Sequence, residues 1–460
     1  MSPASAHEPG ARRRPPKLPR PEPVPLADGP SVLAWERALT PGSPAEGETV
    51  RRAIAEALRA GTPLRETGPA GVDGSRCEYV TFLYEDAHAD EVLLFVNRLT
   101  DESRLQDSLM RRLPGTDVWH LGYLMAATWR ASYCFLPVPQ GRPAPWSAVS
   151  DQVGVRAALD RGVPDPRNPE RCPARGGREL SVVSLAEAGV SPWPVRPDPE
   201  APVPQWLSAP ADHRVLVESC GVAPGEGAST APVVVLFDGE VWWEQGVVGA
   251  VRAAVAAGAL APVHLVLLDS GGTRKRWVEL DGTGGIEDYL ADELLPWVAQ
   301  RAGVCLEPQR VATAGQSLGG LSAILCTLRR PDAVAGAVAQ SSSLWQPYPE
   351  DELRALVEAD GARALERTRI VMEVGEQEWV LTGPHDHFAE QLRQTPASLR
   401  YRRFNGGHDY ACWREGLVPA LVELFPGPHG PDHAATTPPG RPGTAVSRAS
   451  TPVGDLPRTR

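Results

Sequence analysis

The sequence predicts two domains of different class, an all-β domain followed by an α/β domain with a parallel sheet. Its 460 residues exceed the ~100–200 typical of one domain. Short strand-like runs separated by turn residues dominate the first half, whereas strand-like and helix-like runs alternate in the second half. A proline-rich stretch at residues 191–206 separates the two halves, as an interdomain linker would.

Composition excludes several functional classes. Hydrophobic residues make up 42% of the chain, enough to bury a sizeable core. There are 57 acidic and 46 basic residues, and the resulting net charge of −11 argues against nucleic acid or an anionic membrane surface as the main partner. No apolar stretch approaches the ~18–20 residues of a transmembrane helix.

The amino-terminal residues and the cysteines predict a cytoplasmic location. The arginine cluster at residues 12–14 is not followed by an apolar segment, so we expect no signal peptide. The seven cysteines are spread along the chain without a C-x-x-C pair, which is typical of reduced thiols rather than a disulfide framework or a zinc site.

Residues 1–30 and 427–460 are rich in proline and poor in periodic hydrophobics, and they are predicted to be disordered tails. Residues 31–195 contain strand-like runs at 78–86, 92–99 and 131–138 and one helical pattern at 50–60. This pattern predicts an all-β domain, an immunoglobulin-like sandwich. Residues 196–210 are taken as the linker.

Residues 211–426 are predicted to form the α/β domain. Strand-like runs at 233–240, 263–269, 336–343 and 369–375 alternate with helical patterns at 246–258, 287–303 and 413–425. The run at 233–240 is almost continuously apolar, as a strand buried on both faces should be. This alternation predicts a parallel sheet with helices on both faces.

The main chemical motif is G-x-S-x-G at Gly315, Ser317 and Gly319. It lies between a strand-like run and a helical pattern, which is the setting of the nucleophile elbow in α/β-hydrolases. The turn exposes the serine hydroxyl above the carboxyl edge of the sheet. Ser317 is therefore the predicted nucleophile, and the second domain is predicted to have the α/β-hydrolase fold.

A serine hydroxyl needs a base to take its proton, and in this fold the acid and the histidine follow the serine in the chain. Three histidines do so within the predicted domain: His385, His387 and His408. His408 lies in a glycine-rich loop before the last helical pattern, where the fold carries its base. We predict His408 as the base, with His385 and His387 as candidates for the mouth of the site.

The acid should follow a strand between the serine and the histidine. The segment IVMEVGEQE offers Glu373, Glu376 and Glu378. Glu373 falls within the predicted strand, whereas the other two lie on the loop beyond it. Glu378 is favoured, and Glu376 and Glu373 remain as alternatives; the acid would fix the histidine tautomer.

The oxyanion formed during ester cleavage needs two donors. One is predicted to be the backbone N–H of Leu318, directly after the nucleophile. The second is predicted to come from the loop after the strand at 233–240, from Glu240 in preference to Gly239, because the turn at Asp238 and Gly239 would aim the next amide inward.

These motifs together resemble the enterochelin (enterobactin) esterase family, whose members are cytoplasmic hydrolases that open ferric catecholate-siderophore trilactones. The most specific pattern is G-G-H-D-x-x-C-W-R-x-G-L at 406–417, supported by AGQSLGGLSAI and VVVLFDGEVWW in the second domain and by RLPGTDVW, TWRASYCFLP and DPRNP in the first. The resemblance covers residues 32–426. It implies Ser317 as nucleophile and His408 as base, and a β-sandwich that helps to shape the substrate site.

The resemblance also implies a ferric catecholate siderophore as substrate, with no metal or organic cofactor, because iron arrives with the substrate. A ferric tris-catecholate is a trianion, so an acidic protein would need local basic and aromatic side chains. The candidates are Arg130, Arg276, Trp243 and Trp345. The chain departs from the family pattern at Leu318 and in the serines at 341–343, where a glycine is expected, so the pocket shape is expected to differ.

The predicted function is thus that of a cytoplasmic serine esterase acting on a siderophore trilactone. One alternative is a carboxylesterase or acyltransferase of the same fold that acts on other esters. Another is a non-catalytic siderophore- or glycan-binding protein, against which the intact serine and histidine argue.

Overall fold

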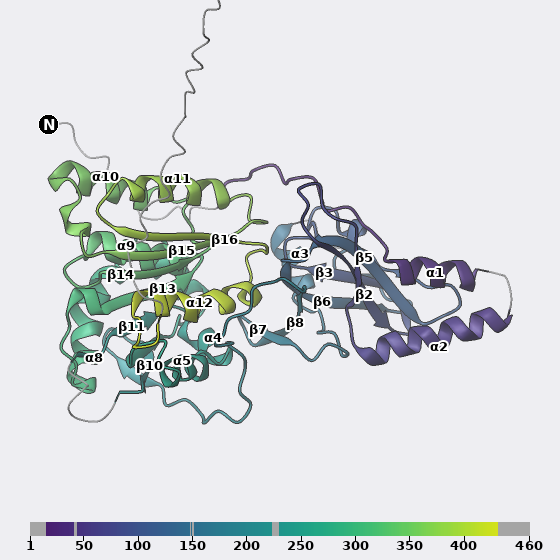
Figure 1. Cartoon of the computed structure of the whole chain (residues 1–460), viewed down its shortest axis with the longest axis horizontal. Coiled ribbons are helices and arrows are strands. Elements are labelled where there is room, and N and C mark those ends of the chain that lie inside the picture. The colour runs from purple at the N-terminus through teal and green to yellow at the C-terminus, as the bar shows by residue number, and fades with distance from the viewer. Residues whose placement is uncertain (1–14, 41–43, 148, 150, 223–229, 431–460) are drawn as a thin grey trace, which may run out of the picture. The chain divides into compact units, whose positions relative to one another are not determined.

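The computed structural model describes residues 15–40, 44–147, 149, 151–222 and 230–430, which form a sandwich domain and an α/β domain (Figure 1). Residues 1–14 of the first predicted tail and residues 431–460 of the second lie outside this description.

The first domain is a sandwich of two four-stranded antiparallel sheets, as predicted. Alternate side chains of both sheets, among them Phe82, Leu94 and Tyr133, meet in a core that is almost fully buried. In sheet order, the strands are β1 (Leu64–Thr67), β2 (Cys77–Glu85), β5 (Val118–Ala126) and β4 (Arg111–Arg112) in one sheet, and β3 (Ala89–Val96), β6 (Arg130–Pro139), β8 (Arg178–Ser184) and β7 (Arg171–Ala174) in the other.

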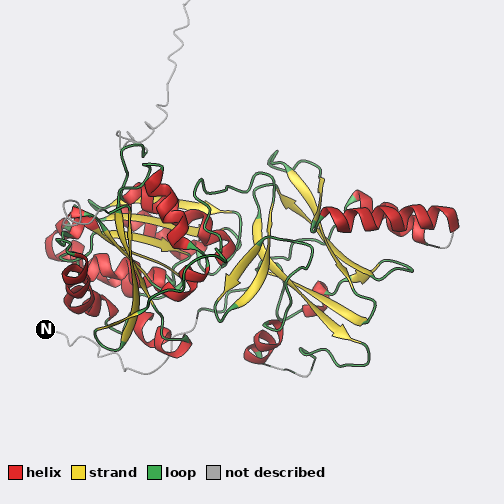
Figure 2. Ribbon diagram, turned by 90° about the horizontal axis from the view of Figure 1, so that it is seen from below, coloured by secondary structure: helices red, strands yellow, loops and turns green. Residues whose placement is uncertain are grey.

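Within the described residues, three α-helices accompany the sandwich, and the sequence predicted one of them. The pattern at 50–60 lies within α2 (Pro44–Ala60), which packs beside α1 (Pro30–Leu39) (Figure 2). The short helix α3 (Gln152–Leu159) is capped by Asp151, whose carboxylate accepts from Gly154 N. Val32 and Trp35 of α1 are buried in a small core of their own, which explains why so short a helix is stable here.

Residues 15–30 do not form the predicted disordered tail. The Arg20 guanidinium donates to the backbone carbonyls of Arg98, Leu99 and Thr100, and Leu26 forms a β-bridge with Tyr123. The prediction was wrong here because it counted only apolar burial, whereas hydrogen bonds to the main chain hold this segment.

The α/β domain contains an eight-stranded sheet in the order β16-β15-β14-β13-β11-β12-β10-β9. The first six strands in this order are parallel, so their carboxyl ends share one edge; β10 and β9 are antiparallel to their neighbours. The bounds are β9 Leu207–Ala209, β10 His213–Cys220, β11 Val233–Leu236, β12 Val263–Leu268, β13 Val311–Gln316, β14 Gly336–Gln340, β15 Arg369–Gly375 and β16 Ser398–Phe404.

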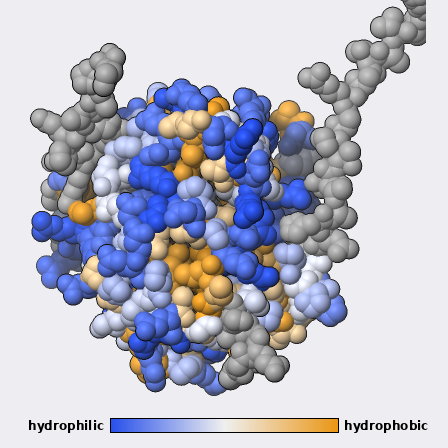
Figure 3. Space-filling model, turned by 90° about the vertical axis from the view of Figure 1, so that its left-hand side faces the viewer, coloured by the Kyte–Doolittle hydropathy of each residue, from blue (hydrophilic) through white to orange (hydrophobic). Residues whose placement is uncertain are grey.

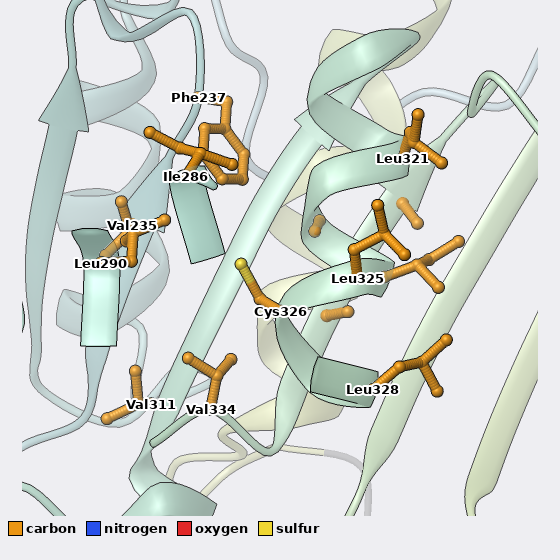
Figure 4. Close-up of a cluster of buried hydrophobic side chains, with 14 of the residues drawn as sticks. Val235, Phe237, Ile286, Leu290, Val311, Leu321, Leu325, Cys326, Leu328 and Val334 are labelled. Atoms are coloured by element: carbon orange, nitrogen blue, oxygen red, sulfur yellow. The ribbon is translucent and has the colours of Figure 1, made fainter. Parts of the chain in front are cut away.

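Helices cover both faces of this sheet, as the alternating pattern predicts. On one face, Leu321, Leu325 and Leu328 of α9 pack over the sheet beside Phe237 and the helices that precede α9 (Figure 4). On the other face, α5 and α12 bury a second apolar cluster. The bounds are α4 Gly239–Glu244, α5 Val247–Ala256, α6 Thr273–Leu280, α7 Ile286–Tyr289, α8 Leu295–Ala302, α9 Leu318–Arg329, α10 Tyr348–Asp360, α11 Thr382–Arg393 and α12 Tyr410–Leu424.

The predicted linker at 196–210 is partly structured. It contains β9, and the adjoining proline-rich segment is anchored by Val195 in the second apolar cluster and by an ion pair between Arg196 and Glu415. Proline content indicated a free connection, but an extended chain without internal hydrogen bonds can still pack along a surface.

The surface seen in Figure 3 is mainly hydrophilic, with a smaller hydrophobic patch near its centre. Among the residues that the structure describes, no helix is both long and apolar enough to cross a membrane.

Replacing Leu325 by alanine tests the packing of α9. Leu325 is fully buried, so Leu325→Ala should lower the free energy of unfolding by about 2–5 kcal/mol. Val357 on α10 is 47% exposed, and Val357→Ala should change the free energy of unfolding by less than about 0.5 kcal/mol. Urea unfolding of both variants measures the difference; equal midpoints would contradict the packing described for α9.

Candidate active site

Four neighbouring strands of the sheet are each followed by a polar residue at the same edge. Ser317 follows β13, Ser341 follows β14, Glu378 lies just beyond β15, and His408 follows β16. The strand order β13-β14-β15-β16 places these carboxyl ends in a row. Sheet topology therefore gathers residues that lie up to 91 positions apart in the sequence (408 − 317).

Ser317 has the strained backbone of a nucleophile elbow. Its φ of 59° and ψ of −117° are unusual for a residue other than glycine, and α9 begins at the next residue. A Cβ on Gly315 would lie 2.6 Å from the carbonyl carbon of Gly319, so these glycines let β13 and α9 approach closely. Leu318 is the first residue of α9, so its backbone N–H has no carbonyl within the helix to which it can donate a hydrogen bond.

Glu378 and His408 form a direct pair. Nδ1 of His408 lies 2.5 Å from Oε1 of Glu378. The other carboxylate oxygen, Oε2, accepts from Gly375 N at 2.8 Å and from the Ser341 hydroxyl at 2.5 Å. Both oxygens of this buried carboxylate are thus hydrogen-bonded.

The environment keeps Glu378 ionised. Burial acts to raise the pKa of Glu378, but the charge and hydrogen bond of His408, the charge of Arg98 and the bond from Ser341 outweigh it and hold this pKa below its usual value. An ionised carboxylate can only accept, so Nδ1 of His408 carries the proton of this hydrogen bond. In the neutral tautomer with the proton on Nδ1, the lone pair lies on Nε2. A free Nε2 is what a general base requires.

Neither of the two other candidate acids pairs with His408. The carboxylate of Glu373 accepts from Gln340 Nε2 of β14 and from Arg402 Nη2 of β16. The side chain of Glu376 is exposed. Of the three glutamates, only Glu378 hydrogen-bonds to His408.

Two hydrogen bonds tie the nucleophile strand to neighbouring parts of the site, one to the serine segment after β14 and one to the residues after His408. Ser343 N donates to the carbonyl of Ser317 at 3.0 Å, which joins the elbow to the serine segment that also contacts Glu378. Gln316 Nε2, one residue before the nucleophile, lies 2.6 Å from the hydroxyl of Tyr410, two residues after the base.

The predicted oxyanion loop has a left-handed turn at Asp238, whose φ is 58°. A Cβ on Gly239 would lie 2.5 Å from the Leu267 backbone, so only glycine fits there. Glu240 is the second residue of α4, and its side chain accepts from Ser270 N at 2.9 Å. Its amide lies in the first turn, where no carbonyl of the helix accepts it.

Asp238 is held by two arginines. Arg276 donates Nε and Nη2 to its two oxygens at 2.6 and 2.8 Å, and Arg175 of the sandwich lies 2.9 Å away. Burial acts to raise the pKa of Asp238, but the charges of Arg276 and Arg175 outweigh it and lower this pKa. This fully buried carboxylate is therefore a fixed anchor for the loop.

The predicted substrate arginines have internal roles, which corrects the prediction. Arg276 is buried against Asp238, and Arg130 is buried with Nε on Ser184 Oγ and Nη2 on the Gly189 carbonyl. Sequence alone could not show that each has a nearby oxygen partner. The two candidate tryptophans are half-buried: Trp243 lies on α4, and Trp345 lies two residues beyond Ser343.

His385 does not line the mouth of the site. It is fully buried, its Nδ1 donates to the Leu381 carbonyl at 2.8 Å, and its Nε2 accepts from Ser342 N at 3.0 Å. Burial lowers the pKa of His385 to about 4. His387 is 63% exposed on α11.

Ser341 and Trp413 are site residues that the sequence analysis did not identify. Ser341 has a φ of 44°, a conformation that is unusual for a residue other than glycine. The Ser341 hydroxyl accepts from Trp413 Nε1 at 2.8 Å. The Trp413 ring packs edge-on against the His408 ring, with 4.8 Å between the ring centroids. The tryptophan in the G-G-H-D-x-x-C-W pattern was the available signal.

Comparisons with known proteins agree with this architecture. Residues 79–194 match the family model described as "Enterochelin esterase, N-terminal", and residues 223–424 match "Putative esterase". The iron(III) enterobactin esterase of Escherichia coli O6:H1 is 30% identical over 367 residues, which cover 75% of this chain and 91% of that protein. The chain belongs to the enterobactin esterase family.

Other relatives in this family extend the comparison. The iron(III) salmochelin esterase of the same Escherichia coli strain is 30% identical, covering 76% of this chain and 88% of that protein. The crystal structure of ferric enterobactin esterase from Salmonella typhimurium has a TM-score of 0.68 at 28% identity, covering 80% of this chain and 98% of that chain. A crystal structure of the Shigella flexneri enterobactin esterase in the presence of enterobactin has a TM-score of 0.64 at 28% identity, covering 84% of this chain and 98% of that chain.

Replacing Ser341 tests its support of Glu378. Ser341→Ala removes a hydrogen bond to a buried carboxylate, so kcat should fall about 10-fold with little change in KM. Ser342→Ala is the matched control, because the buried Ser342 hydroxyl has no hydrogen-bond partner among the described residues. Steady-state ester hydrolysis measures both; equal kcat values for the two variants would refute the role of Ser341.

The buried His385 predicts a pH dependence of stability. Between pH 6.5 and about 4 the unfolded chain binds a proton that the folded protein excludes, so the free energy of unfolding falls as the pH drops through this window. The contribution is on the order of 1–3 kcal/mol. His385→Gln, which keeps one donor and one acceptor, should show a smaller loss between pH 7 and 5 in urea unfolding; an unchanged loss would contradict this origin.

Proposed function

We propose that this protein is a serine esterase that hydrolyses the ester bonds of a ferric catecholate-siderophore trilactone. The observation that carries the chemistry is the His408–Glu378 pair, which lies at the same edge of the sheet as the strained elbow at Ser317. The substrate class is supported by the relatives, which are named iron(III) enterobactin and salmochelin esterases.

In the acylation step, Oγ of Ser317 attacks the ester carbonyl carbon while Nε2 of His408 takes the hydroxyl proton. The carbonyl oxygen becomes an oxyanion that accepts from the amides of Leu318 and Glu240. Glu378 stabilises the imidazolium. Collapse of the tetrahedral intermediate breaks the bond to the ester oxygen, and His408 returns its proton to that leaving oxygen.

In the second step, water attacks the acyl-serine with His408 again acting as base. The acyl carbon gains a hydroxyl, Ser317 regains its proton, and a free carboxylic acid results. One such cycle on a trilactone opens the ring to a linear trimer, and further cycles shorten the trimer. The opened ligand holds iron less well, because its catechols are no longer preorganised by the ring.

Trp243 and Trp345 are the proposed apolar walls for the catechol rings. Both are half-buried and both follow loops at the carboxyl edge of the sheet, after β11 and β14 respectively. Aromatic side chains of this kind offer a large contact area to flat rings.

We place the reaction in the cytoplasm. The seven cysteines are free thiols, and all but Cys305 are buried, which fits a protein kept in a reducing compartment.

The proposal is tested by incubating the full chain with ferric enterobactin and, separately, with p-nitrophenyl acetate and a feruloyl ester. Mass spectrometry should detect first a linear trimer heavier than the trilactone by one water, with kcat/KM at least about 100-fold above that for the simple esters. Ser317→Ala should abolish turnover of all three substrates, lowering kcat by about 10³-fold or more.

Two outcomes would overturn the proposal in different ways. Undiminished turnover by Ser317→Ala would refute catalysis at this serine. Preference for the feruloyl or acetyl ester, with the trilactone left intact, would keep the serine mechanism but assign the protein to general carboxylesterases.

A further inference from the structure

The loop that carries the predicted base is held by the sandwich domain as well as by its own sheet. We call residues 405–409 the base loop. Asn97, directly after β3, donates Nδ2 to the carbonyl of His408 at 3.1 Å. Ser132 N of β6 donates to the Asp409 carboxylate at 2.5 Å, and Arg130 N donates to the Asn405 carbonyl at 3.1 Å. The base loop is thus bonded to the sandwich before, at and after the histidine.

The two glycines before the histidine are explained by this contact. A Cβ on Gly407 would lie 2.3 Å from Cγ of Arg98 and 2.5 Å from Oδ1 of Asn97. A Cβ on Gly406 would lie 2.9 Å from the carbonyl oxygen of Arg130. Neither glycine has a positive φ. Gly407 is therefore required for close approach of the sandwich, and Gly406 for close approach of both the sandwich and Cys412 of α12, rather than for an unusual backbone conformation.

The sandwich also reaches the loop that carries the acid. Trp129 Nε1 donates to Gln377 Oε1 at 3.2 Å, one residue before Glu378. The Arg98 guanidinium lies over the ring of Trp379 at 5.3 Å, one residue after it. Two segments of the sandwich, residues 97–98 after β3 and residues 129–132 at the start of β6, thus contact both the loop of the acid and the loop of the base.

Asp409 links the sandwich to the start of α12 through its two carboxylate oxygens. Its second carboxylate oxygen accepts from Ala411 N at 3.0 Å and caps α12, so the same side chain fixes the helix start and binds the sandwich. The ring of His408 is oriented by Glu378, but the position of its Cα depends on its backbone partners. The side-chain partner of that backbone carbonyl is Asn97.

We propose that Asn97 is a positioning residue for the catalytic base, and that the sandwich thereby controls the chemical step and not only substrate binding. This inference rests on the proposed triad. A displacement of about 1 Å between base and nucleophile costs about 100-fold in rate, so the loss of one backbone anchor should appear in kcat. A sandwich that only formed a wall for the siderophore would instead affect KM for the large substrate alone.

The test compares Asn97→Ala and Asn97→Asp in the full chain. The aspartate keeps the size of the side chain but its carboxylate cannot donate to the His408 carbonyl. We expect both variants to lower kcat about 10–100-fold for p-nitrophenyl acetate and for ferric enterobactin alike, with KM changed by less than about 3-fold. The rate at which a fluorophosphonate labels Ser317 should fall by the same factor, because it reports the activated nucleophile without the siderophore.

Glu170→Gln is the matched control. Glu170 of the sandwich also pairs across to the α/β domain, with Arg414 of α12. Among the described residues, its side chain has no hydrogen bond or ion pair with the base loop or with the loop that carries Glu378. This variant should keep both kcat and the labelling rate within about 2-fold of the parent protein. Thermal unfolding of all variants verifies that they are folded, and the aspartate variant serves if the alanine variant is not.

Wild-type kcat and labelling rates in a folded Asn97 variant would overturn the inference, as would a change confined to KM for ferric enterobactin. Ser317→Ala in the same assays separates this failure from failure of the proposed function. If Ser317→Ala is inactive while Asn97 variants are fully active, only the positioning role is wrong; if Ser317→Ala is active, the triad itself is wrong.

Discussion

The hydrogen bond between His408 Nδ1 and Glu378 Oε1 is the interaction around which the rest of the site is arranged. It requires a carboxylate to stay charged in a buried position, and the fold meets this requirement with donors from three directions: the end of β15, the serine after β14, and the imidazole itself. Without them, burial would favour the neutral acid, which could not fix the tautomer of His408.

The same principle operates on the other side of the nucleophile. Asp238 is buried and charged, and it stays so because Arg276 comes from its own domain and Arg175 from the sandwich. The side chain of Gln316 joins Asp238 to the residues after His408: it donates to Asp238 and Tyr410 and accepts from Trp242. Such networks stabilise only when every member has its partner. In this network, the side chains of Asp238, Gln316 and Trp242 all have hydrogen-bond partners.

Local patterns sufficed for what depends on local chain geometry. The strand–turn–helix setting of Ser317 and the alternation of the second domain could be read directly, because hydrophobic period and glycine spacing encode them. Partners far apart in sequence could not: Arg130 and Arg276 were expected at the ligand but are buried on internal oxygens. Arg175 gave no signal at all, since its role depends on where the sandwich meets Asp238, and β9 was hidden in proline-rich sequence.

The glycines at 406 and 407 connect the two domains mechanically. Side chains and backbone of the sandwich approach the main chain of these two glycines closely. A small displacement of the sandwich from the α/β domain would therefore break this contact. Heat or denaturant that parts the domains by a small amount would misalign the imidazole while both hydrophobic cores remain intact. Loss of esterase activity would then precede global unfolding. The temperature at which activity is lost would depend on the stability of the contact between the domains rather than on the stability of either hydrophobic core.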